Sequence, residues 1–222
     1  MVTPEDDRAE SVSYPEPLPQ APKTLIIIPA YNEGKNIGAV LNGIQKHIPD
    51  IPILVINDGS SDNTETIAQQ HNAKVISLPC NSGYGVALQT GFLYAVKNNY
   101  SIVVQMDSDG QHDPANIAVL LEEAQKDDCD VVIGSRFIGK AHYKTSFARH
   151  AGMLLFGTIA SIICRQKVTD PTSGFQVLKS RAIELIASDE YPPDYPDADF
   201  IILMNRNGFK IKEVSVTMHA SP

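Results

Sequence analysis

Five short runs of apolar residues, rich in Ile and Val, recur between residues 24 and 135 with polar or helix-period stretches between them. Each run is nearly continuous rather than alternating with polar residues, which is typical of strands buried on both faces. Strands that alternate with helices predict right-handed crossovers and a mostly parallel sheet. The runs are TLIIIP (24–29), PILVIN (52–57), KVISL (74–78), SIVVQM (101–106) and DVVIGS (130–135).

The stretches between these runs carry helix signals. Asp62 and Glu65 have the spacing of a capping box, and Asp113 followed by Pro114 is typical of an N-cap with proline in the first helical position. A third stretch places its apolar residues on one helical face; they are Ile37, Val40, Leu41, Ile44 and Ile48.

The alternation ends after Gly134, and no internal repeat is present. The predicted fold class is α/β: a Rossmann-like, doubly wound, mostly parallel sheet in one domain. The expected remaining elements are a basic loop, an apolar helix at about 147–164, a turn at 169–174, a short strand at 175–179, a helix at about 197–207 and a strand at 209–216.

Composition limits the class of protein. The chain has 222 residues and is 43% hydrophobic, enough for the core of one large domain, which we expect over 23–222. Residues 1–22 hold five prolines and five acidic residues and are predicted to be a disordered tail. A net charge of −8 argues against a nucleic-acid partner. The three cysteines lack metal-ligand spacing and indicate a reducing compartment such as the cytoplasm.

One segment departs from the acidic character of the chain. Residues 131–169 contain no Asp or Glu but several basic residues. Two interpretations stay open: a solvated helix and loop, or a surface that contacts phosphate or an anionic membrane. The longest apolar run, Met153 to Cys164, is shorter than the roughly 20 residues of a membrane-spanning helix. We therefore expect a soluble, cytoplasmic chain, in contact at most with the membrane surface.

Polar turns follow the first four predicted strands. They are PAYNEGKN (29–36), NDGSSDNT (57–64), PCNSGYG (79–85) and DSDGQHDP (107–114). Asn, Asp and Gly are ordinary turn formers, so each turn alone has a structural explanation. Because open parallel sheets bind ligands at the carboxyl ends of their strands, four such turns in succession predict a binding site there.

The chemistry of the turns narrows the ligand. Leu88 stands where a dinucleotide fingerprint needs its third glycine, and no P-loop or EF-hand pattern fits. Asp107 and Asp109 form an Asp-x-Asp pair at a strand end, with both carboxylates on one side and about 7 Å apart. Hard divalent cations take oxygen ligands and often keep substrate phosphates in their shell, so the pair suits Mg²⁺ or Mn²⁺ bridging to a diphosphate.

Six motifs, in order, resemble those of the family 2 glycosyltransferases, which have the GT-A fold. The resemblance covers about residues 24–217 and is strongest to the branch that contains dolichyl-phosphate mannose synthase and other polyprenyl-phosphate glycosyltransferases. It divides the domain into a nucleotide-sugar half, about 23–135, and an acceptor half, about 136–222. The motifs are IIIPAYNEGKNI, VINDGSSDNT, NSGYGVALQTGF, MDSDGQHDP, GSRF and DPTSGF.

The resemblance also implies roles for particular residues. Asp109 would be the principal ligand of Mg²⁺ or Mn²⁺, Asp107 would face the metal and the sugar or ribose, and Gln111 would complete the metal shell. Asp58 would hydrogen-bond the base. The other implied donor-binding residues are Pro29, Tyr31, Glu33, Gly85 and Ser108, and the implied catalytic residues are Arg136, Asp170, Asp197 and Asp199.

Two departures from the family pattern bear on function. Tyr84 stands where many members have a basic residue, which puts a diphosphate contact there in doubt. The sequence ends shortly after EVSVTMHASP, where relatives commonly continue into a basic segment and often membrane helices. Membrane anchoring would then come from a partner, or the chain is truncated.

The expected activity is that of an inverting, metal-dependent hexosyltransferase. The donor would be GDP-mannose or a UDP-sugar, and the acceptor a polyprenyl or dolichyl phosphate. A phosphomonoester has a second pKa of about 6, so it needs no base, and Asp197 or Asp199 would be optional. Transfer to a glycan hydroxyl, sugar nucleotidyl transfer and a non-catalytic partner subunit stay as alternatives. His112 is interpreted as a turn or supporting residue rather than a ligand, and Asp170 as a turn former or a base.

Overall fold

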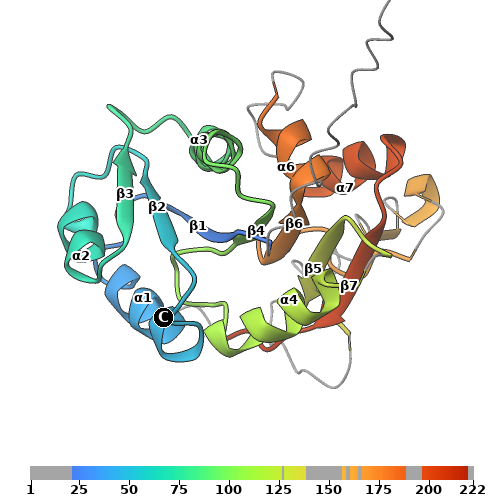
Figure 1. Ribbon diagram of the computed structural model, residues 1–222, viewed down its shortest axis with the longest axis horizontal. Coiled ribbons are helices and arrows are strands. Elements are labelled where there is room, and N and C mark those ends of the chain that lie inside the picture. Colours follow the sequence, from blue (N-terminus) through green and yellow to red (C-terminus); the bar gives the residue numbers. More distant parts are fainter. Residues whose placement is uncertain are drawn as a thin grey trace, which may run out of the picture.

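Seven strands form one sheet in the order β3-β2-β1-β4-β6-β5-β7 (Figure 1). The computed structural model describes residues 22–126, 128–138, 157–158, 161–164, 167–188 and 197–219, with the backbone alone for 197–199. The strands are β1 (Thr24–Ala30), β2 (Ile53–Asn57), β3 (Lys74–Ser77), β4 (Ile102–Gln105), β5 (Val131–Ser135), β6 (Gln176–Lys179) and β7 (Ile211–Ser215).

Strand direction follows the predicted plan with one exception. Neighbouring pairs among β1, β2, β3 and β4 are parallel, as are β5 and β7. Strand β6 runs antiparallel to both of its neighbours, β4 and β5. The mostly parallel α/β prediction is thus confirmed, and each predicted strand agrees with the structure to within two residues at either end.

Helices cover both faces of the sheet. Figure 1 shows α1, α2 and α4 on one side and α3, α6 and α7 on the other. The predicted helix at about 197–207 is confirmed as α7. The helices are α1 (Ile37–His47), α2 (Thr64–Gln70), α3 (Tyr84–Lys97), the short 3-10 helix η1 (Pro114–Asn116), α4 (Ile117–Ala124), α6 (Ser180–Ile186) and α7 (Asp197–Arg206).

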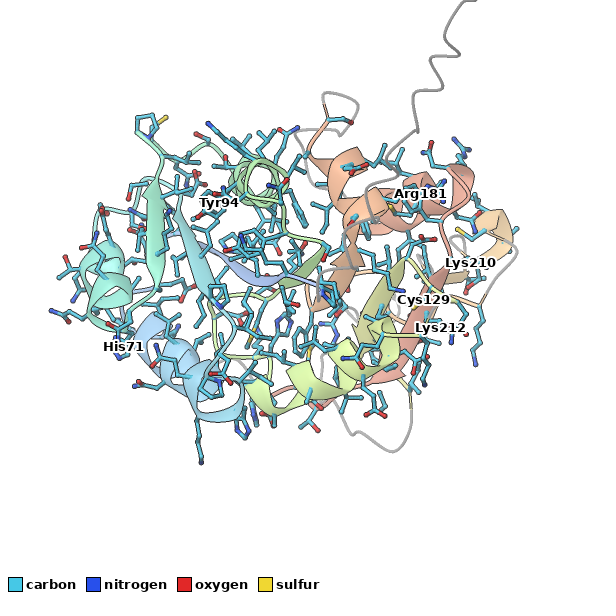
Figure 2. The ribbon with its side chains drawn as sticks, viewed as in Figure 1. His71, Tyr94, Cys129, Arg181, Lys210 and Lys212 are labelled. Atoms are coloured by element: carbon cyan, nitrogen blue, oxygen red, sulfur yellow. The ribbon has the colours of Figure 1, made fainter. Side chains whose placement is uncertain are left out.

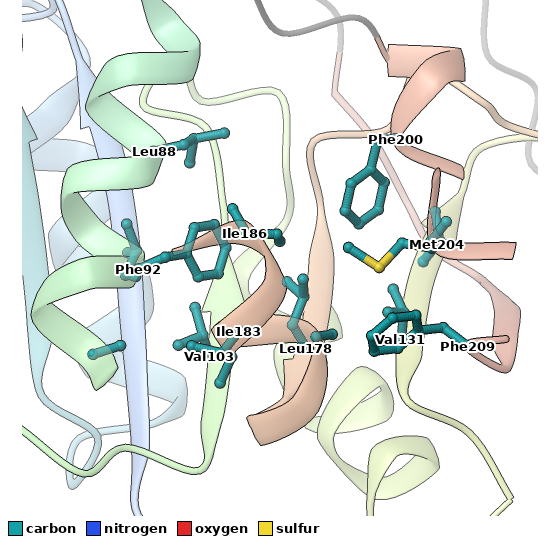
Figure 3. Close-up of a cluster of buried hydrophobic side chains, with 14 of the residues drawn as sticks. Leu88, Phe92, Val103, Val131, Leu178, Ile183, Ile186, Phe200, Met204 and Phe209 are labelled. Carbon is teal, nitrogen blue, oxygen red and sulfur yellow. The ribbon is translucent and has the colours of Figure 1, made fainter. Parts of the chain in front are cut away.

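Each face of the sheet has its own hydrophobic core. On the side of α3, α6 and α7, buried side chains from these helices meet the sheet (Figure 3). Phe92 and Met204 are fully buried there, and Leu178 lies between them on β6. The other face packs Ile26 and Val55 against Leu41, Ile44 and Leu120. Burying such side chains contributes about 1.5–3 kcal/mol each, which fixes the strand ends that carry the site.

Strand β3, at one edge of the sheet, differs from the prediction that all five runs are buried. Both ends of β3 are exposed, because β3 has only β2 as a neighbour. Strand β7 forms the other edge, and a surface ion-pair cluster ties it to α4: the Lys212 ammonium lies 2.9 Å from Glu123 and 2.6 Å from Asp128 (Figure 2). These hydrogen bonds, that of Asp128 first, raise the pKa of Lys212 above its ordinary value.

Two other predictions of local structure have opposite outcomes. The Asp113 side chain accepts a hydrogen bond from the Ala115 amide at 3.0 Å, which confirms the N-cap before Pro114. The capping box of Asp62 and Glu65 is wrong. Helix α2 begins after Asn63, whose side chain makes no capping hydrogen bond. The Asp62 carboxylate instead accepts the Gly34 amide, from a different turn, on Oδ2 and the Thr64 amide on Oδ1, each at 3.0 Å.

Helix α6 was not predicted from the sequence, because no side-chain cap precedes it. Most of the predicted apolar helix at about 147–164 lies outside the described residues. Its described parts, 157–158 and 161–164, are helical. Residues 1–21, which include nearly all of the predicted tail, also lie outside them. Within the described part of the chain, no helix has both the length and the apolar content to cross a bilayer.

Candidate active site

The four polar turns meet at the carboxyl edge of the parallel strands, and hydrogen bonds join each turn to the next. Between the first and second turns, Asn32 Oδ1 accepts the Ser61 amide at 2.8 Å. The Gly34 amide donates to Asp62 Oδ2, and the Glu33 amide donates to the hydroxyl of the Thr64 side chain at 2.9 Å. Strand ends and cross-turn bonds together therefore bring the segments into one site.

Asp58 joins the second turn to the third. Its buried carboxylate accepts the Ser82 amide at 2.7 Å on Oδ1 and the Gly83 amide at 3.0 Å on Oδ2. The residue predicted to bind the base thus also shapes the loop beside the pocket. Carboxylate oxygens can accept more than one hydrogen bond, so this role leaves acceptor capacity toward a ligand.

Gly59 occupies the tightest point between these two turns. Its φ is +65°, and a Cβ atom there would lie 2.3 Å from the carbonyl carbon of Cys80. We expect Gly59→Ala to lower the free energy of unfolding by more than about 2 kcal/mol, because a backbone clash adds to a left-handed conformation that costs 1–2 kcal/mol alone. Urea denaturation measures the effect.

Gly208 supplies the control for this prediction. It also has a positive φ, +71°, but a Cβ atom there would meet nothing within 4 Å. Gly208→Ala should therefore cost only about 1–2 kcal/mol of stability. Equal losses in the two variants would contradict the steric argument at Gly59.

Tyr84 joins the third turn to the fourth and completes a pocket of about 340 Å³. Its hydroxyl donates to Asp107 Oδ1 at 2.7 Å. The pocket brings together most of the predicted donor-binding and metal-binding residues. Its lining consists of Pro29, Ala30, Tyr31, Glu33, Asp58, Asn81, Tyr84, Ala87, Asp107, Ser108 and Asp109.

Some lining residues were missed and some predicted residues lie elsewhere. Ala30, Asn81 and Ala87 were not predicted individually, although Asn81 belongs to a turn that the sequence marks as part of the site. Gly85 is buried in the first turn of α3 and does not line the pocket. Gln111 is also absent from the lining but contacts Asp109 directly.

The fourth turn has a donor set that fits a divalent cation. Asp107 and Asp109 line the same pocket, and Asp109 accepts the Gln111 amide at 2.9 Å and the Gln111 side-chain Nε2 at 2.5 Å. Among the described residues, no three His, Cys, Asp or Glu side chains are arranged to hold an ion by themselves. Two carboxylates suit a cation such as Mg²⁺ or Mn²⁺ that takes its other ligands from water and substrate phosphates.

His112 lies against Asp107, one of the two aspartates of the fourth turn. It is buried and stacks on Phe175 with ring centroids 4.9 Å apart. Burial lowers the pKa of its imidazole, which favours the neutral ring. Its Nδ1 accepts the Asp107 amide at 3.2 Å, which leaves Nε2 to carry the proton 3.6 Å from Asp107 Oδ2. The geometry agrees with the supporting role predicted for His112.

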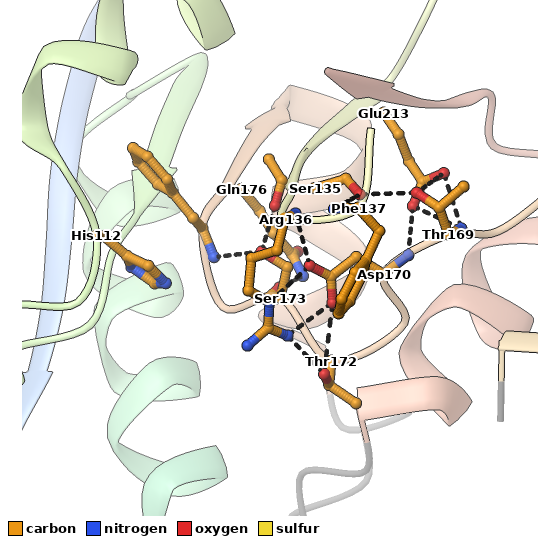
Figure 4. Close-up of polar contacts among 12 residues, drawn as sticks. His112, Ser135, Arg136, Phe137, Thr169, Asp170, Thr172, Ser173, Gln176 and Glu213 are labelled. Atoms are coloured by element: carbon orange, nitrogen blue, oxygen red, sulfur yellow. Dashed lines mark hydrogen bonds and ion pairs between the residues drawn. The ribbon is translucent and has the colours of Figure 1, made fainter. Parts of the chain in front are cut away.

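Arg136 and Asp170 form a buried, bidentate ion pair (Figure 4). Arg136 Nε donates to Asp170 Oδ2 at 2.8 Å, Nη2 donates to Oδ1 at 2.7 Å, and the Arg136 amide donates to Oδ2 at 3.0 Å. The Asp170 side chain has no exposed surface. Asp170 was interpreted either as a turn former or as a catalytic base. This geometry favours the first interpretation, in which Asp170 shapes its turn and positions Arg136.

Glu213 holds the turn that contains Asp170, and sequence reasoning missed it. From strand β7, its carboxylate accepts the Thr169 amide at 3.0 Å and the Asp170 amide at 2.9 Å (Figure 4). A lone Glu in the strand FKIKEVSV gives no local sign of such a role, because the contact joins residues more than 40 positions apart.

The remaining predicted catalytic residues are only partly described. Asp197 and Asp199 lie in the first turn of α7, and their side chains fall outside the described residues. Of the basic segment, Arg136 and Lys167 are described, whereas its other basic residues are not; these are Lys140, His142, Lys144, Arg149, His150 and Arg165.

Comparisons with known proteins agree with this fold and site. Residues 25–186 match the family model for glycosyl transferase family 2. The polyprenol monophosphomannose synthase of Mycolicibacterium smegmatis is 29% identical over 206 residues, which cover 88% of this chain and 77% of that protein. The UDP-N-acetylglucosamine–dolichyl-phosphate N-acetylglucosaminyltransferase of Methanococcus voltae is 30% identical over 210 residues, covering 86% and 83%.

Solved structures show the same architecture. Glucosyl-3-phosphoglycerate synthase from Mycobacterium tuberculosis, crystallised with Mn²⁺, uridine diphosphate and glucosyl-3-phosphoglycerate, superposes with a TM-score of 0.69 at 20% identity. The match covers 90% of this chain and 73% of that one. It confirms the GT-A fold predicted from the motifs. With a family model that matches most of the chain, we conclude that this protein belongs to glycosyl transferase family 2 and is a glycosyltransferase.

Proposed function

We propose that the protein transfers a hexose, with inversion, from GDP-mannose or a UDP-sugar to a polyprenyl or dolichyl phosphate. The observation that carries this proposal is the single pocket in which Tyr31, Asp58, Asp107 and Asp109 meet at the carboxyl edge of the sheet. The sugar-nucleotide and lipid-phosphate specificities in the names of its relatives support the substrate classes.

Each part of the pocket has a proposed role toward the donor. Pro29, Tyr31 and Glu33 border the nucleoside, and Asp58 accepts a hydrogen bond from the base. Asp107 faces the sugar or ribose, next to Ser108. The carboxylates of Asp107 and Asp109 line the pocket together, which suits a charged diphosphate bound through a cation.

Asp109 and Asp107 would hold Mg²⁺ or Mn²⁺, with Gln111 adjacent. When bound, the cation supplies Lewis-acid stabilisation of the charge that develops on the departing diphosphate. The solved neighbour that contains Mn²⁺ and uridine diphosphate supports this assignment. The carboxylates of Asp107 and Asp58 also maintain the shape of the pocket, because each accepts a hydrogen bond from a neighbouring turn.

The acceptor half contributes Arg136 and the turn that fixes it. Asp170 and Glu213 hold this turn, and Gly174 from the same turn lies against Asp107. An ionised phosphate is already a nucleophile at neutral pH, so Asp197 or Asp199 need not act as a base. We place the protein at the cytoplasmic face of a membrane, held there by surface contact or by an anchoring partner, because its acceptor would lie in the bilayer.

A donor screen tests this proposal. Purified protein is incubated with Mn²⁺, undecaprenyl phosphate and radiolabelled GDP-mannose, UDP-glucose or UDP-N-acetylglucosamine, and the lipid is extracted. We expect label in the lipid with one donor class and none when EDTA replaces Mn²⁺. Label in an added soluble glycan but not in the lipid would overturn the acceptor assignment.

A further inference from the structure

Tyr84 sits at the start of α3, where its ring lines the pocket and its hydroxyl reaches the fourth turn. The hydroxyl donates to Asp107 Oδ1 at 2.7 Å and accepts from Gln105 Nε2 at 3.3 Å. Gln105 is buried at the end of β4, two residues before Asp107. The chemistry of these groups sets the direction of both hydrogen bonds. Gln105 Nε2 can only donate, so the Tyr84 hydroxyl accepts from it and gives its one proton to the Asp107 carboxylate.

Gly174 lies beside the same carboxylate and beside the Tyr84 hydroxyl. Strands β4 and β6 pair with Gln105 opposite Gln176, and the same antiparallel register places Gly174 opposite Asp107. A Cβ atom on Gly174 would lie 2.6 Å from Asp107 Oδ2 and 3.0 Å from the Tyr84 hydroxyl. The absence of a side chain at Gly174 therefore leaves the space that the Asp107 carboxylate occupies.

The chemistry of tyrosine separates two roles for this position. A basic residue could pair with a donor diphosphate, but a phenol is neutral at pH 7 and has one proton to donate. That proton is directed to Asp107. The interaction of Tyr84 is therefore with the carboxylate that faces the cation and sugar, rather than with the diphosphate.

We propose that Tyr84 is a positioning residue, which together with the space at Gly174 holds the Asp107 carboxylate in the orientation that receives the cation–diphosphate complex. This inference rests on the proposed function of Asp107. The two residues come from α3 and from the turn before β6, so the donor and acceptor halves of the chain both determine where this carboxylate lies.

The test measures Mn²⁺ affinity directly. Free Mn²⁺ is followed by electron paramagnetic resonance during titration in the presence of UDP and, separately, GDP. We expect Tyr84→Phe to weaken Mn²⁺ binding about tenfold, because a hydrogen bond to a charged group is lost at a partly exposed site. Gly174→Ala should also weaken Mn²⁺ binding, because the added Cβ atom would displace the Asp107 carboxylate.

Tyr94→Phe is the matched control. Tyr94 lies on the same helix, ten residues further along, and its hydroxyl accepts a hydrogen bond from Lys74 at 2.9 Å, away from the pocket lining (Figure 2). We expect this variant to bind Mn²⁺ as the wild type does. Thermal unfolding midpoints of all three variants show whether any change in affinity is merely a loss of folding.

A double-mutant cycle identifies the residue through which Tyr84 acts. In an Asp107→Asn background, Tyr84→Phe should have no further effect on Mn²⁺ binding. If Tyr84→Phe still weakened Mn²⁺ binding tenfold in the Asp107→Asn background, the inference would be overturned. It would also be overturned if Tyr84→Phe weakened the binding of UDP or GDP in the absence of metal, because Tyr84 would then contact the diphosphate directly. Unchanged affinity in Tyr84→Phe would overturn it too. If the wild-type protein bound Mn²⁺ neither with UDP nor with GDP, that result would contradict the proposed function itself.

Discussion

Replacing Asp109 by asparagine is expected to lower sugar transfer about 100- to 1000-fold, the usual cost of removing one group that stabilises transition-state charge. The substitution keeps the shape of the side chain and an oxygen for the Gln111 amide, which Asp109 Oδ1 accepts at 2.9 Å. It removes the negative charge that the proposed cation requires. The measurements are initial rates of lipid labelling at saturating donor and Mn²⁺ affinity by titration.

Asp113→Asn provides a control with the same change of charge four residues away. Asp113 caps η1 through the Ala115 amide, and asparagine caps helices about as well as aspartate. This variant should keep wild-type transfer and stability. If Asp109→Asn also kept its rate, the assignment of Asp109 to the cation would be wrong, whereas loss of rate in both variants would point to the net charge of the loop.

Replacing Asp170 by alanine is expected to lower the free energy of unfolding by about 3–5 kcal/mol, the range for breaking a buried ion pair from one side. The variant leaves the Arg136 side chain, of which only 12% is exposed, without its carboxylate partner. It also removes the acceptor of the Arg136 amide. Urea denaturation is the suitable measurement, because guanidinium chloride would screen the charges.

The surface ion-pair cluster of Lys212 offers the comparison. The Asp128 carboxylate approaches Lys212 to 2.6 Å, closer than the nearest contact of Asp170 with Arg136, but 58% of its side chain is exposed. Water and salt replace such a contact at little cost. Asp128→Ala should therefore leave the urea midpoint almost unchanged. Equal destabilisation by the two substitutions would show that burial is not what makes the Asp170 pair important.

The parallel half of the fold and its site could be predicted from local patterns. Runs of Ile and Val specify buried strands, and parallel strands bring their carboxyl ends to one edge wherever the helices lie. The polar turns after those strands therefore had to meet, and Tyr31, Asp58 and Asp107 do share one pocket. The roles assigned to Asp197 and Asp199 depend on family resemblance and stay predictions.

The parts that escaped prediction depend on contacts between distant segments. Strand β6 enters the sheet between β4 and β5 in the antiparallel direction, and nothing in the run FQVLK specifies that neighbour or direction. The approach of Gly174 to Asp107 follows from that register, so it was equally hidden. The Asp62 carboxylate likewise accepts the amide of Gly34, from another turn, together with that of Thr64, and the local sequence does not specify this distant partner.

The hydrogen bonds between successive turns also limit how this site can diverge. Surface loops usually accept insertions and deletions because few contacts depend on their length. Here the backbone amides of Gly34, Ser61 and Ser82 each donate to a side chain from a neighbouring turn. A change of length in one turn would remove a partner from the next, so the four turns are expected to keep their lengths together and to vary, as a lineage evolves, through side chains that face the pocket.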